Sequence, residues 1–237
     1  MDLAAREQLR SEQYLEVLRL SFPDTNHHCR FFWRPLDHRA RILVSRRDGQ
    51  GRTAHYCCPL TALKLIRQAS RLLLNRYDPY DRQYAIWANL RFPTYEHQAL
   101  FYCAFVALKR QDREPSPPRL DDYFPGEAVV FSGEIEDDSY LHWLRVLRDA
   151  DTDAVRLEAS PRRGPMVGVP IWTAFVGEYV GARRWLRRIS NNVIELESLR
   201  PYVFCHSYRP PRVQGRFRLN FTTREDAENF KHQFQLL

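Results

Sequence analysis

Three closely spaced arginines in the first half of the chain have an arrangement that could hold a phosphate group. Arg39 and Arg41 are two residues apart in a stretch that alternates like a β-strand, which would place both side chains on one face. Arg34 ends the preceding apolar stretch and would lie across the connecting loop. Guanidinium groups bind phosphate through charge-assisted hydrogen bonds. With Arg46 further along, the candidate anion-binding site consists of Arg34, Arg39, Arg41 and Arg46. The alternative is a solvated strand that carries arginines without a ligand.

A second basic cluster, in the other half of the chain, consists of Arg183, Arg184, Arg187 and Arg188. In a helix these side chains would gather on one side, whereas a strand would divide them between two faces. Arginine beside an aromatic ring, here Trp185, suits cation–π contact or stacking on a nucleic-acid base. The alternative is a basic surface strand in which Trp185 and Leu186 are partly buried.

The charge of the chain is divided unevenly between its halves. The chain has 36 basic and 29 acidic residues, and residues 1–112, with 18 basic and 11 acidic residues, hold the whole net charge of +7. An acidic partner for the first half is one interpretation, and an arginine-rich composition without function is the other. In the second half, the stretch with Asp149, Asp151 and Asp153 is acidic, so we expect it to repel phosphate.

The sequence contains none of the motifs that would indicate an enzyme. GxxxxGK[ST], GxGxxG, GxSxG and HExxH are all absent, so the common nucleotide, hydrolase and zinc-protease sites are not supported. His55 and Cys57 would share a strand face, but a structural zinc site normally needs two such pairs. The five cysteines are odd in number and include the adjacent Cys57 and Cys58. We therefore expect reduced cysteines, no metal, no cofactor and no enzymatic activity.

The elements that must position these residues form two series of strands. Residues 1–22 carry leucines at helical spacing, which predicts an N-terminal helix. Residues 28–110 read as short strands, with 60–68 fitting either a strand or a helix, followed by a helix that Thr94 can cap. Residues 111–126 contain four prolines and no periodicity, which predicts a linker. Residues 127–237 read as further strands and a short helix that Thr223 can cap.

The two series of strands end in the same way. Leu90, Phe92, Thr94, Glu96 and Phe101 recur at one constant offset as Leu219, Phe221, Thr223, Glu225 and Phe230. In both places a strand leads into a capped helix whose phenylalanine would point back to the core. This recurrence predicts two copies of one unit, each with several antiparallel strands and one closing helix.

That unit resembles the pleckstrin-homology-like (PH-like) fold, a strongly bent seven-stranded antiparallel sheet closed by a C-terminal helix. The resemblance covers residues 28–110 and 127–237 and rests on the order of the elements and on the strand–helix junction. The chain is also similar to fungal proteins with an IWANLRFPTYEHQALFYCAFVALK-type block and a VPIWTAFV block, a family with no assigned activity. The expected fold class is therefore α+β, with two PH-like units in tandem and an N-terminal helix. A single mixed α+β domain is the competing architecture.

The resemblance also bears on the first basic cluster. The spacing of Arg34, Arg39 and Arg41 is similar to the phosphoinositide pattern of pleckstrin-homology domains, a basic residue, a spacer and then basic-x-Arg-x-hydrophobic. The spacer is shorter than in the family, and Arg34 stands where lysine is usual.

The fold implies a non-enzymatic binding or scaffold module that mediates protein interaction, because such sheets offer strand edges and loop mouths. One alternative is a binder of an anionic ligand, a phosphoinositide headgroup or nucleic acid, through the basic first unit. The other is an unrecognised enzyme, which a pocket of converging titratable groups would indicate. No apolar run approaches the roughly 20 residues of a membrane-spanning helix, and no signal peptide follows Met1. We expect an intracellular protein, in the cytoplasm or the nucleus.

Overall fold

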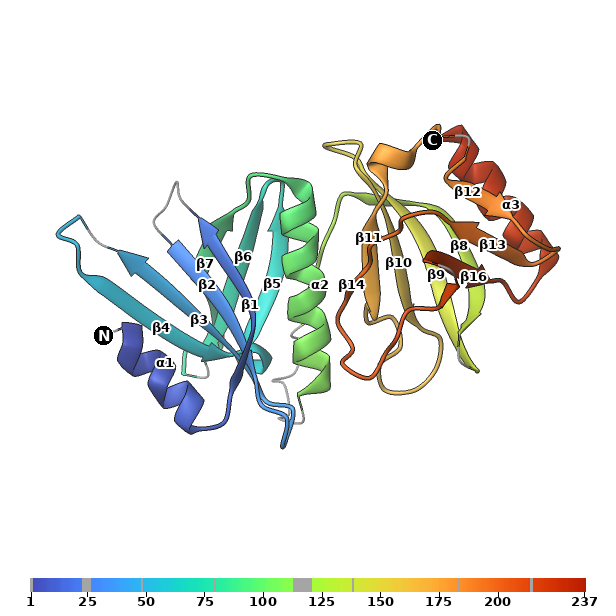
Figure 1. Cartoon of the computed structure of the whole chain (residues 1–237). Coiled ribbons are helices and arrows are strands. Elements are labelled where there is room, and N and C mark those ends of the chain that lie inside the picture. The colour runs from blue at the N-terminus through green and yellow to red at the C-terminus, as the bar shows by residue number, and fades with distance from the viewer. Residues whose placement is uncertain are drawn as a thin grey trace. The chain divides into compact units, whose positions relative to one another are not determined.

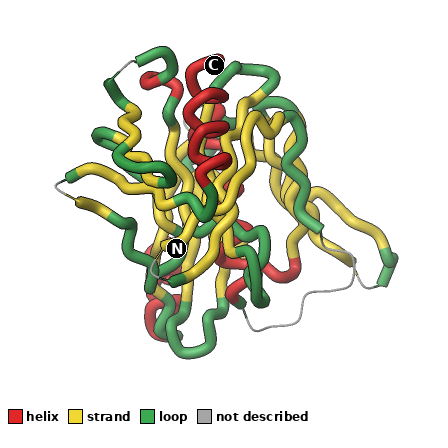
Figure 2. Tube along the Cα trace, turned by 90° about the vertical axis from the view of Figure 1, so that its right-hand side faces the viewer, coloured by secondary structure: helices red, strands yellow, loops and turns green. Residues whose placement is uncertain are grey.

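The computed structural model describes residues 2–22, 27–47, 49–78, 80–112, 121–137, 139–182, 184–213 and 215–237. The chain forms two compact units, Met1–Pro125 and Gly126–Leu237, which run from blue to green and from yellow to red in Figure 1. Each unit is built from antiparallel strands followed by a helix. Figure 2 shows the strands in yellow and the helices in red.

The first unit contains a four-stranded and a three-stranded antiparallel sheet, each with its strands in sequence order. The strands are β1 (Leu15–Phe22), β2 (His27–Trp33), β3 (Ala40–Arg47), β4 (Thr53–Pro59), β5 (Leu63–Gln68), β6 (Arg71–Asp78) and β7 (Gln83–Arg91). Helix α1 (Asp2–Ser11) precedes the first sheet, and helix α2 (Tyr95–Gln111) follows the second. Short connections join most neighbouring strands, which is the geometry of successive antiparallel hairpins.

The second unit repeats this plan with two additions. Its main strands are β8 (Glu127–Asp137), β9 (Tyr140–Asp149), β10 (Val155–Pro161), β11 (Trp172–Phe175), β12 (Leu186–Arg188), β13 (Val193–Leu196) and β16 (Arg216–Asn220), followed by α3 (Arg224–Leu236). The added strands β14 (Tyr202–Val203) and β15 (Arg212–Val213) lie in the connection between β13 and β16. Within this second unit, β14 extends the sheet of β8 to β11 beside β11, and β15 extends the sheet of β12, β13 and β16 beside β16.

Alternation along each strand decides which side chains enter the core. In β16, Phe217 and Leu219 are buried, whereas Arg216 and Arg218 are half-buried on the opposite face. A shift of one residue would bury the arginines and expose the apolar side chains, so this alternation fixes the register of the strand. The same physical rule leaves a polar outer face on the second sheet of this unit.

Both closing helices begin at a threonine. The Thr94 hydroxyl accepts a hydrogen bond from the backbone N–H of His97, and the Thr223 hydroxyl accepts one from Asp226. These bonds satisfy a first-turn donor that has no partner inside the helix. The capping expected from the sequence is therefore present in both units.

The helix phenylalanines occupy matching places. Phe101 and Phe230 are buried, and each ring lies 5.4 Å from the phenylalanine at the end of the preceding strand, Phe92 or Phe221 (centroid to centroid). One turn further along the helices, Phe105 and Phe234 form another buried pair at the same sequence offset. The predicted repeat of a strand, a capped helix and an inward-pointing phenylalanine is thus a real structural repeat, and the two-unit architecture of antiparallel strands with a closing helix is present.

The N-terminal helix is shorter than the predicted 1–22. It ends at Ser11, Gln13 turns the chain with a positive φ of 65°, and residues 15–22 form β1, paired with β2. The leucines misled the prediction because Leu18, Leu20 and Phe22 also fit an alternation of two, and this is the pattern that the sheet uses. Two signals in the sequence were thus in competition, and tertiary pairing decided between them. β1 belongs to the first sheet, which therefore begins before residue 28.

The predicted linker 111–126 is also wrong in part. Residues 113–120 lie outside the described part of the chain, but α2 includes Gln111, and 121–125 pack on the first unit. Tyr123 pairs with β5 through hydrogen bonds with the backbone of Leu65 and Arg67. Asp122 meets the buried Lys109 of α2, with Nζ at 3.0 and 2.8 Å from its two carboxylate oxygens. A buried ammonium needs a carboxylate partner of this kind. The proline content of residues 111–126, on which the linker prediction rested, gives no sign of that ion pair.

We expect Phe101→Ala and Phe230→Ala each to lower the free energy of unfolding by about 3–5 kcal/mol, because each leaves a cavity in a closed core. Urea denaturation followed by circular dichroism measures the change. The exposed Leu36 provides the control, since Leu36→Ala should change the stability by no more than about 0.5 kcal/mol. A loss of less than about 1 kcal/mol for either phenylalanine variant would contradict the equivalent roles of the two rings.

Asp122→Asn should destabilise the protein by about 3–5 kcal/mol, because it removes the carboxylate charge that faces the buried Lys109 ammonium. Asp121→Asn, at the exposed neighbouring carboxylate, is the matched control and should have little effect. The double variant Lys109→Met with Asp122→Leu should recover much of the loss, since it removes both charges. Equal stabilities of the two single variants, measured by urea denaturation, would show that residues 121–125 do not help to hold the first unit together.

Candidate functional site

The hairpin between β2 and β3 places Arg34 and Arg39 around a carboxylate of the chain itself. Arg34 donates two hydrogen bonds to Asp37, with Nε to Oδ1 at 2.8 Å and Nη2 to Oδ2 at 2.5 Å. Arg39 Nε lies 3.2 Å from the second of these oxygens. The hydrogen bonds from Arg34 lower the pKa of Asp37 to about 2, so its carboxylate stays charged at neutral pH. Asp37 therefore occupies the space where a phosphate was predicted.

Arg41 has a different partner. Its Nε donates to the hydroxyl of Tyr14 at 3.1 Å, and the Arg34 and Arg41 guanidinium groups lie 4.9 and 5.7 Å from the centroid of the Tyr14 ring. Tyr14 is buried between the end of α1 and the first sheet. Arg34 and Arg41 thus help to fix α1, through cation–π contact and a hydrogen bond. The hairpin with the phosphoinositide-like spacing joins the second and third strands of the unit, because β1 precedes β2.

Arg46 lies apart from the other three arginines. It is near the far end of β3, about 16 Å from Arg41 at the usual rise of a strand. Figure 1 shows that the β2–β3 and β3–β4 connections are at opposite ends of the strand. The four residues of the first candidate site are therefore not one site.

At this far end, Arg46 lines a groove of about 510 Å³ between the first sheet and β7. The groove is lined by His27, Val44, Arg46, Tyr56, Ile86, Trp87, Ala88, Asn89 and Leu90. Most of these side chains are apolar or aromatic, yet Ile86 is 62% and Tyr56 54% exposed. His27 and Arg46 are paired in register across β2 and β3, and burial together with the Arg46 charge lowers the pKa of His27. Among the described residues, Arg46 makes no ion pair.

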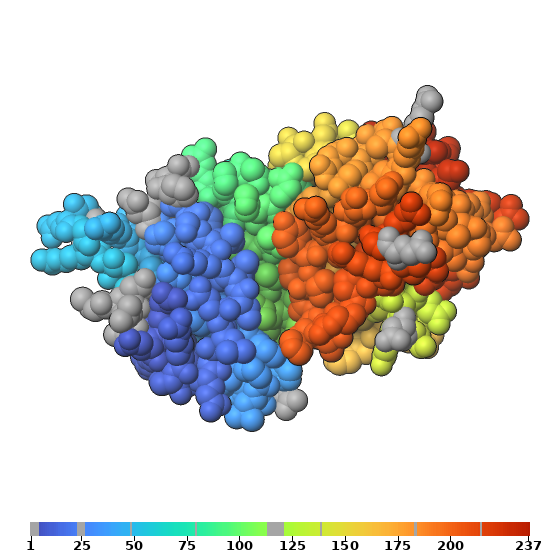
Figure 3. All heavy atoms as spheres, in the orientation of Figure 1, coloured from blue at the N-terminus to red at the C-terminus, as the bar shows by residue number. Residues whose placement is uncertain are grey.

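The corresponding end of the second unit is filled by its own chain. Tyr208, in the connection from β13 to β16, packs against the core, with its ring centroid 6.1 Å from that of the buried His142. Burial and a hydrogen bond to Asp137 raise the pKa of the Tyr208 hydroxyl, so it stays protonated. Figure 3 shows this connection, in orange and red, spread over the surface of the second unit. The extra chain between β13 and β16 thus closes the end that is open in the first unit.

The second basic cluster is divided by its strand. Arg183 lies outside the described residues, and Arg184 is exposed just before β12. Arg187 and Arg188 point to opposite faces of β12, where Arg187 meets Glu195 at 3.1 Å and Arg188 meets Glu228 of α3 at 3.1 Å. Trp185 is buried and stacks on Tyr179, with centroids 4.9 Å apart, so it does not face a nucleic acid. The cluster as predicted is not a single patch.

The acidic hairpin of the second unit is more ordered than the sequence suggested. Asp149 is fully buried, and its Oδ2 accepts hydrogen bonds from the Thr152 N–H at 3.1 Å and from its hydroxyl at 2.8 Å. Asp153 forms an ion pair with Arg148 at 2.9 Å. These carboxylates build the turn, which is a structural use of aspartate.

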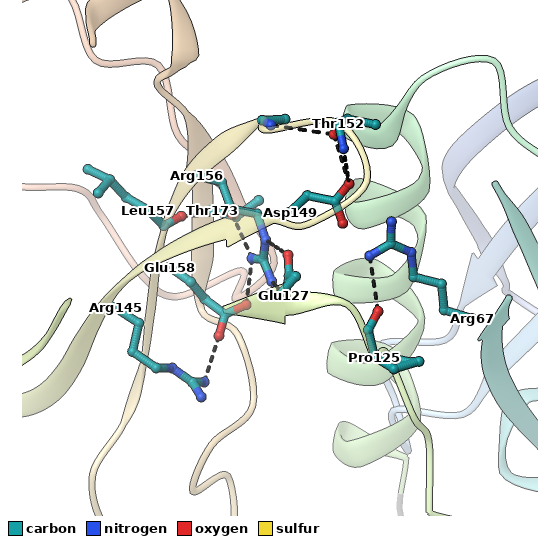
Figure 4. A network of polar contacts seen from close by, with 11 residues as sticks. Arg67, Pro125, Glu127, Arg145, Asp149, Thr152, Arg156, Leu157, Glu158 and Thr173 are labelled. Carbon is teal, nitrogen blue, oxygen red and sulfur yellow. Dashed lines mark hydrogen bonds and ion pairs between the residues drawn. The ribbon is translucent and has the colours of Figure 1, made fainter. Parts of the chain in front are cut away.

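Next to this turn, a buried network joins four strands of the second unit (Figure 4). Arg156 donates to both oxygens of Glu127, at 2.6 and 2.8 Å, and to Glu158 at 2.6 Å and Thr173 at 3.0 Å. Arg145 donates to the other oxygen of Glu158 at 2.6 Å. The two guanidinium groups and the two carboxylates cancel in charge, and their mutual hydrogen bonds join neighbouring strands, so we read the network as a structural feature.

The possible metal ligands have other partners. His55 Nδ1 lies 2.8 Å from the Ser45 hydroxyl, and all five cysteines are free thiols. Burial raises the pKa of Cys29 to about 12 and of Cys58 to about 11, which keeps both protonated. The described residues contain no group of three His, Cys, Asp or Glu side chains that could hold a metal ion. The helices of the described chain include none that is long and apolar enough to cross a membrane.

Two units that share a plan of four plus three antiparallel strands and a closing helix, with one short strand added to each sheet of the second unit, define a tandem PH-type protein. Comparison with family models agrees: residues 2–127 and residues 128–237 match two models, one for each unit, both described as a PH domain found in tandem in fungal proteins. The chain belongs to this family of fungal tandem PH domains. No curated protein and no solved structure matched the chain.

Sequence reasoning missed the groove and its aromatic rim. Tyr56, Ile86 and Trp87 were assigned to strands, but their exposure depends on how two sheets diverge, which a strand pattern does not encode. One signal was present: QYAIWANLRF keeps large apolar side chains at successive positions, so some of them must face away from the core.

The pKa of Asp37 provides a test of the β2–β3 hairpin. We expect its carboxyl to titrate near pH 2 in the folded protein, and Arg34→Gln to raise this pKa towards the usual value of about 3.9. Carbon-13 NMR of the side-chain carboxyl measures both values. Arg46→Gln is the control, because Arg46 is at the other end of β3 and should leave Asp37 unchanged. An ordinary pKa for Asp37 in the wild type would show that Arg34 and Arg39 are not held by this carboxylate and are free for a ligand.

Proposed function

We propose that the chain is a non-enzymatic module that binds a protein partner through the groove between the first sheet and β7 of the first unit. PH domains are in general interaction modules, and the family assignment supports this class of function. The observation that carries the proposal is the groove itself, an open concave surface with large exposed apolar side chains. A soluble domain rarely exposes such side chains together unless another molecule covers them.

The residue types in the groove favour a protein. Trp, Tyr and Arg are the residues most enriched at the energetic centres of protein interfaces, and Trp87, Tyr56 and Arg46 supply one of each. The rings of Trp87 and Tyr56 offer apolar area on side chains with few rotatable bonds, so burying these side chains costs little conformational entropy. The Arg46 guanidinium adds a charged contact that would favour an acidic group on the partner.

The groove has little of what an enzyme needs. The titratable side chains among its described lining residues are His27, Arg46 and Tyr56, and none of these is a carboxylate or a cysteine. Acid–base chemistry usually relies on two groups whose environments separate their pKa values. This composition supports a binding role rather than catalysis. We also propose that the protein works inside the cell, in the cytoplasm or nucleus, because five free cysteines suit a reducing compartment.

An anionic ligand, a phosphoinositide headgroup or nucleic acid, is the second candidate. Arg46 favours it, since this cation has no ion-pair partner among the described residues and lies beside His27. The remaining arginines of the predicted site do not add to it, because Asp37 holds Arg34 and Arg39 and Tyr14 holds Arg41. One free guanidinium is a weak basis for phosphate binding in competition with salt.

Affinity purification of the tagged full chain from its native cells, at low and raised salt, tests the proposal. The groove variant is Tyr56→Ala with Ile86→Ala. Its matched control is Tyr140→Ala with Leu36→Ala, which removes the same residue types at exposed positions elsewhere. We expect the groove variant to lose at least about 2 kcal/mol of binding free energy, roughly thirtyfold in affinity, for the protein that wild type and control retain.

The salt arm separates the two candidates. A protein partner that stays bound at raised salt and depends on Tyr56 and Ile86 supports the proposal. Acidic material that is lost at raised salt, and that Arg46→Gln abolishes, supports the anionic ligand instead. Retention of the same partner by the groove variant and by the control would overturn the groove as the binding site.

A further inference from the structure

A group of arginines on the second unit carries more positive charge than its ion pairs with the described residues neutralise. Arg187 on β12 and Arg218 on β16 stand opposite Glu195 on the strand between them, in one row across the sheet. Arg216 lies two residues before Arg218 and therefore on the same outer face. We call Arg187, Arg216, Arg218 and Glu195 the arginine face.

A single carboxylate organises the arginine face. Glu195 Oε1 accepts from Arg218 at 2.7 Å, and Oε2 accepts from Arg187 at 3.1 Å and lies 3.7 Å from Arg216. The Glu195 side chain is only 6% exposed, whereas that of Arg187 is 61% exposed. Hydrogen bonds from Arg218 and Arg187 lower the pKa of Glu195, so the carboxylate is charged at neutral pH. The buried anion thus holds three cations in fixed positions at the surface.

The charges do not balance. Three guanidinium groups and one carboxylate leave two positive charges on the arginine face. Glu197, the next carboxylate along the chain, is exposed and makes no ion pair with these arginines in the described structure. Each guanidinium has five N–H donors, and Glu195 engages only a few of them. The buried Nε of Arg218 has no hydrogen-bond partner in the described chain.

We propose that the arginine face binds a phosphate monoester carried on an extended peptide. A phosphorylated side chain carries a charge of about −1.5 to −2 at neutral pH, which matches the excess of two. Its oxygens accept the bidentate hydrogen bonds that guanidinium forks donate. Because Glu195 already orders the arginines, binding would cost less side-chain entropy than at a flexible cluster.

The sheet next to the arginine face favours a peptide as the carrier. β15 is the edge strand of this sheet, and both its residues are exposed. Val213 of β15 stands directly opposite Arg216, so both side chains are on the outer face. An extended segment added along β15 would form main-chain hydrogen bonds with this edge. A side chain on the outer face of that segment would lie beside Val213, on the same face of the sheet as Arg216.

This proposal is independent of the groove in the first unit. It is also compatible with the expectation that the acidic hairpin of the second unit repels phosphate, which rested on Asp149, Asp151 and Asp153. Those aspartates belong to the β9–β10 turn of the other sheet, whereas the arginine face is on β12, β13 and β16. A net charge of zero for the second half is therefore compatible with separate positive and negative surfaces.

Fluorescence anisotropy with the full chain tests the proposal. The probes are a labelled seven-residue peptide of alternating valine and serine with its central serine phosphorylated, and the same peptide without phosphate. The variant is Arg187→Gln with Arg216→Gln, which keeps the 2.7 Å pair of Arg218 and Glu195 and so protects the fold. The control, Arg148→Gln with Arg224→Gln, changes net charge equally at exposed ion pairs elsewhere.

We expect the phosphorylated peptide to bind at least about tenfold more tightly than the unphosphorylated one, and the variant to lose this difference while the control keeps it. Arg187→Lys with Arg216→Lys should recover part of the affinity, because it restores charge without the fork. Circular dichroism checks that every variant is folded, and Arg216→Gln alone serves if the double variant is not. Equal binding of the two peptides, or equal losses in variant and control, would overturn the proposal. Binding of phosphoinositide vesicles in place of the peptide would overturn the choice of carrier.

Discussion

The availability of each arginine in this chain depends on guanidinium–carboxylate pairing. One carboxylate, Asp37, holds two arginines, whereas two carboxylates, Glu127 and Glu158, satisfy the buried Arg156. Glu195 is shared by three arginines and leaves charge in excess. Which carboxylate each guanidinium meets, and how many guanidinium groups share that carboxylate, therefore says more about these groups than a count of arginines alone.

The two units show how one plan gives two different surfaces. Both close their cores with a capped helix and a phenylalanine pair at the same separation. Their connections differ most between the last two strands of the plan: Asp78 and Gln83 bound a short connection in the first unit, whereas the second unit uses the long segment between Leu196 and Arg216. That segment supplies two extra strands and Tyr208, which fills the end of the unit. The closed core is common to both units, while the opening belongs to the first.

The sequence was informative where a signal is local and repeated. Thr94 with Phe101, and Thr223 with Phe230, define the strand–helix junction at short range, so the tandem fold followed from them. It was misleading for residues 15–22, because their apolar side chains fit both the helical period and the alternation of a strand. It was also misleading for the proline-rich stretch, which contains the ion-pair partner of Lys109. The candidate site failed for a further reason. Asp37 lies between Arg34 and Arg39 in the sequence, but only the folded hairpin shows that its carboxylate pairs with both guanidinium groups.

The attachment of residues 121–125 to the first unit has a practical consequence for dissecting the protein. The proline-rich composition after residue 112 suggests that the chain could be divided into two fragments there. A fragment ending there would expose the edge of β5 that Tyr123 covers, and an uncovered strand edge is a template for aggregation. A fragment of the first unit should therefore end at Pro125, so that it includes residues 121–125, which pair with β5. Separate expression of the two units should be planned from that boundary.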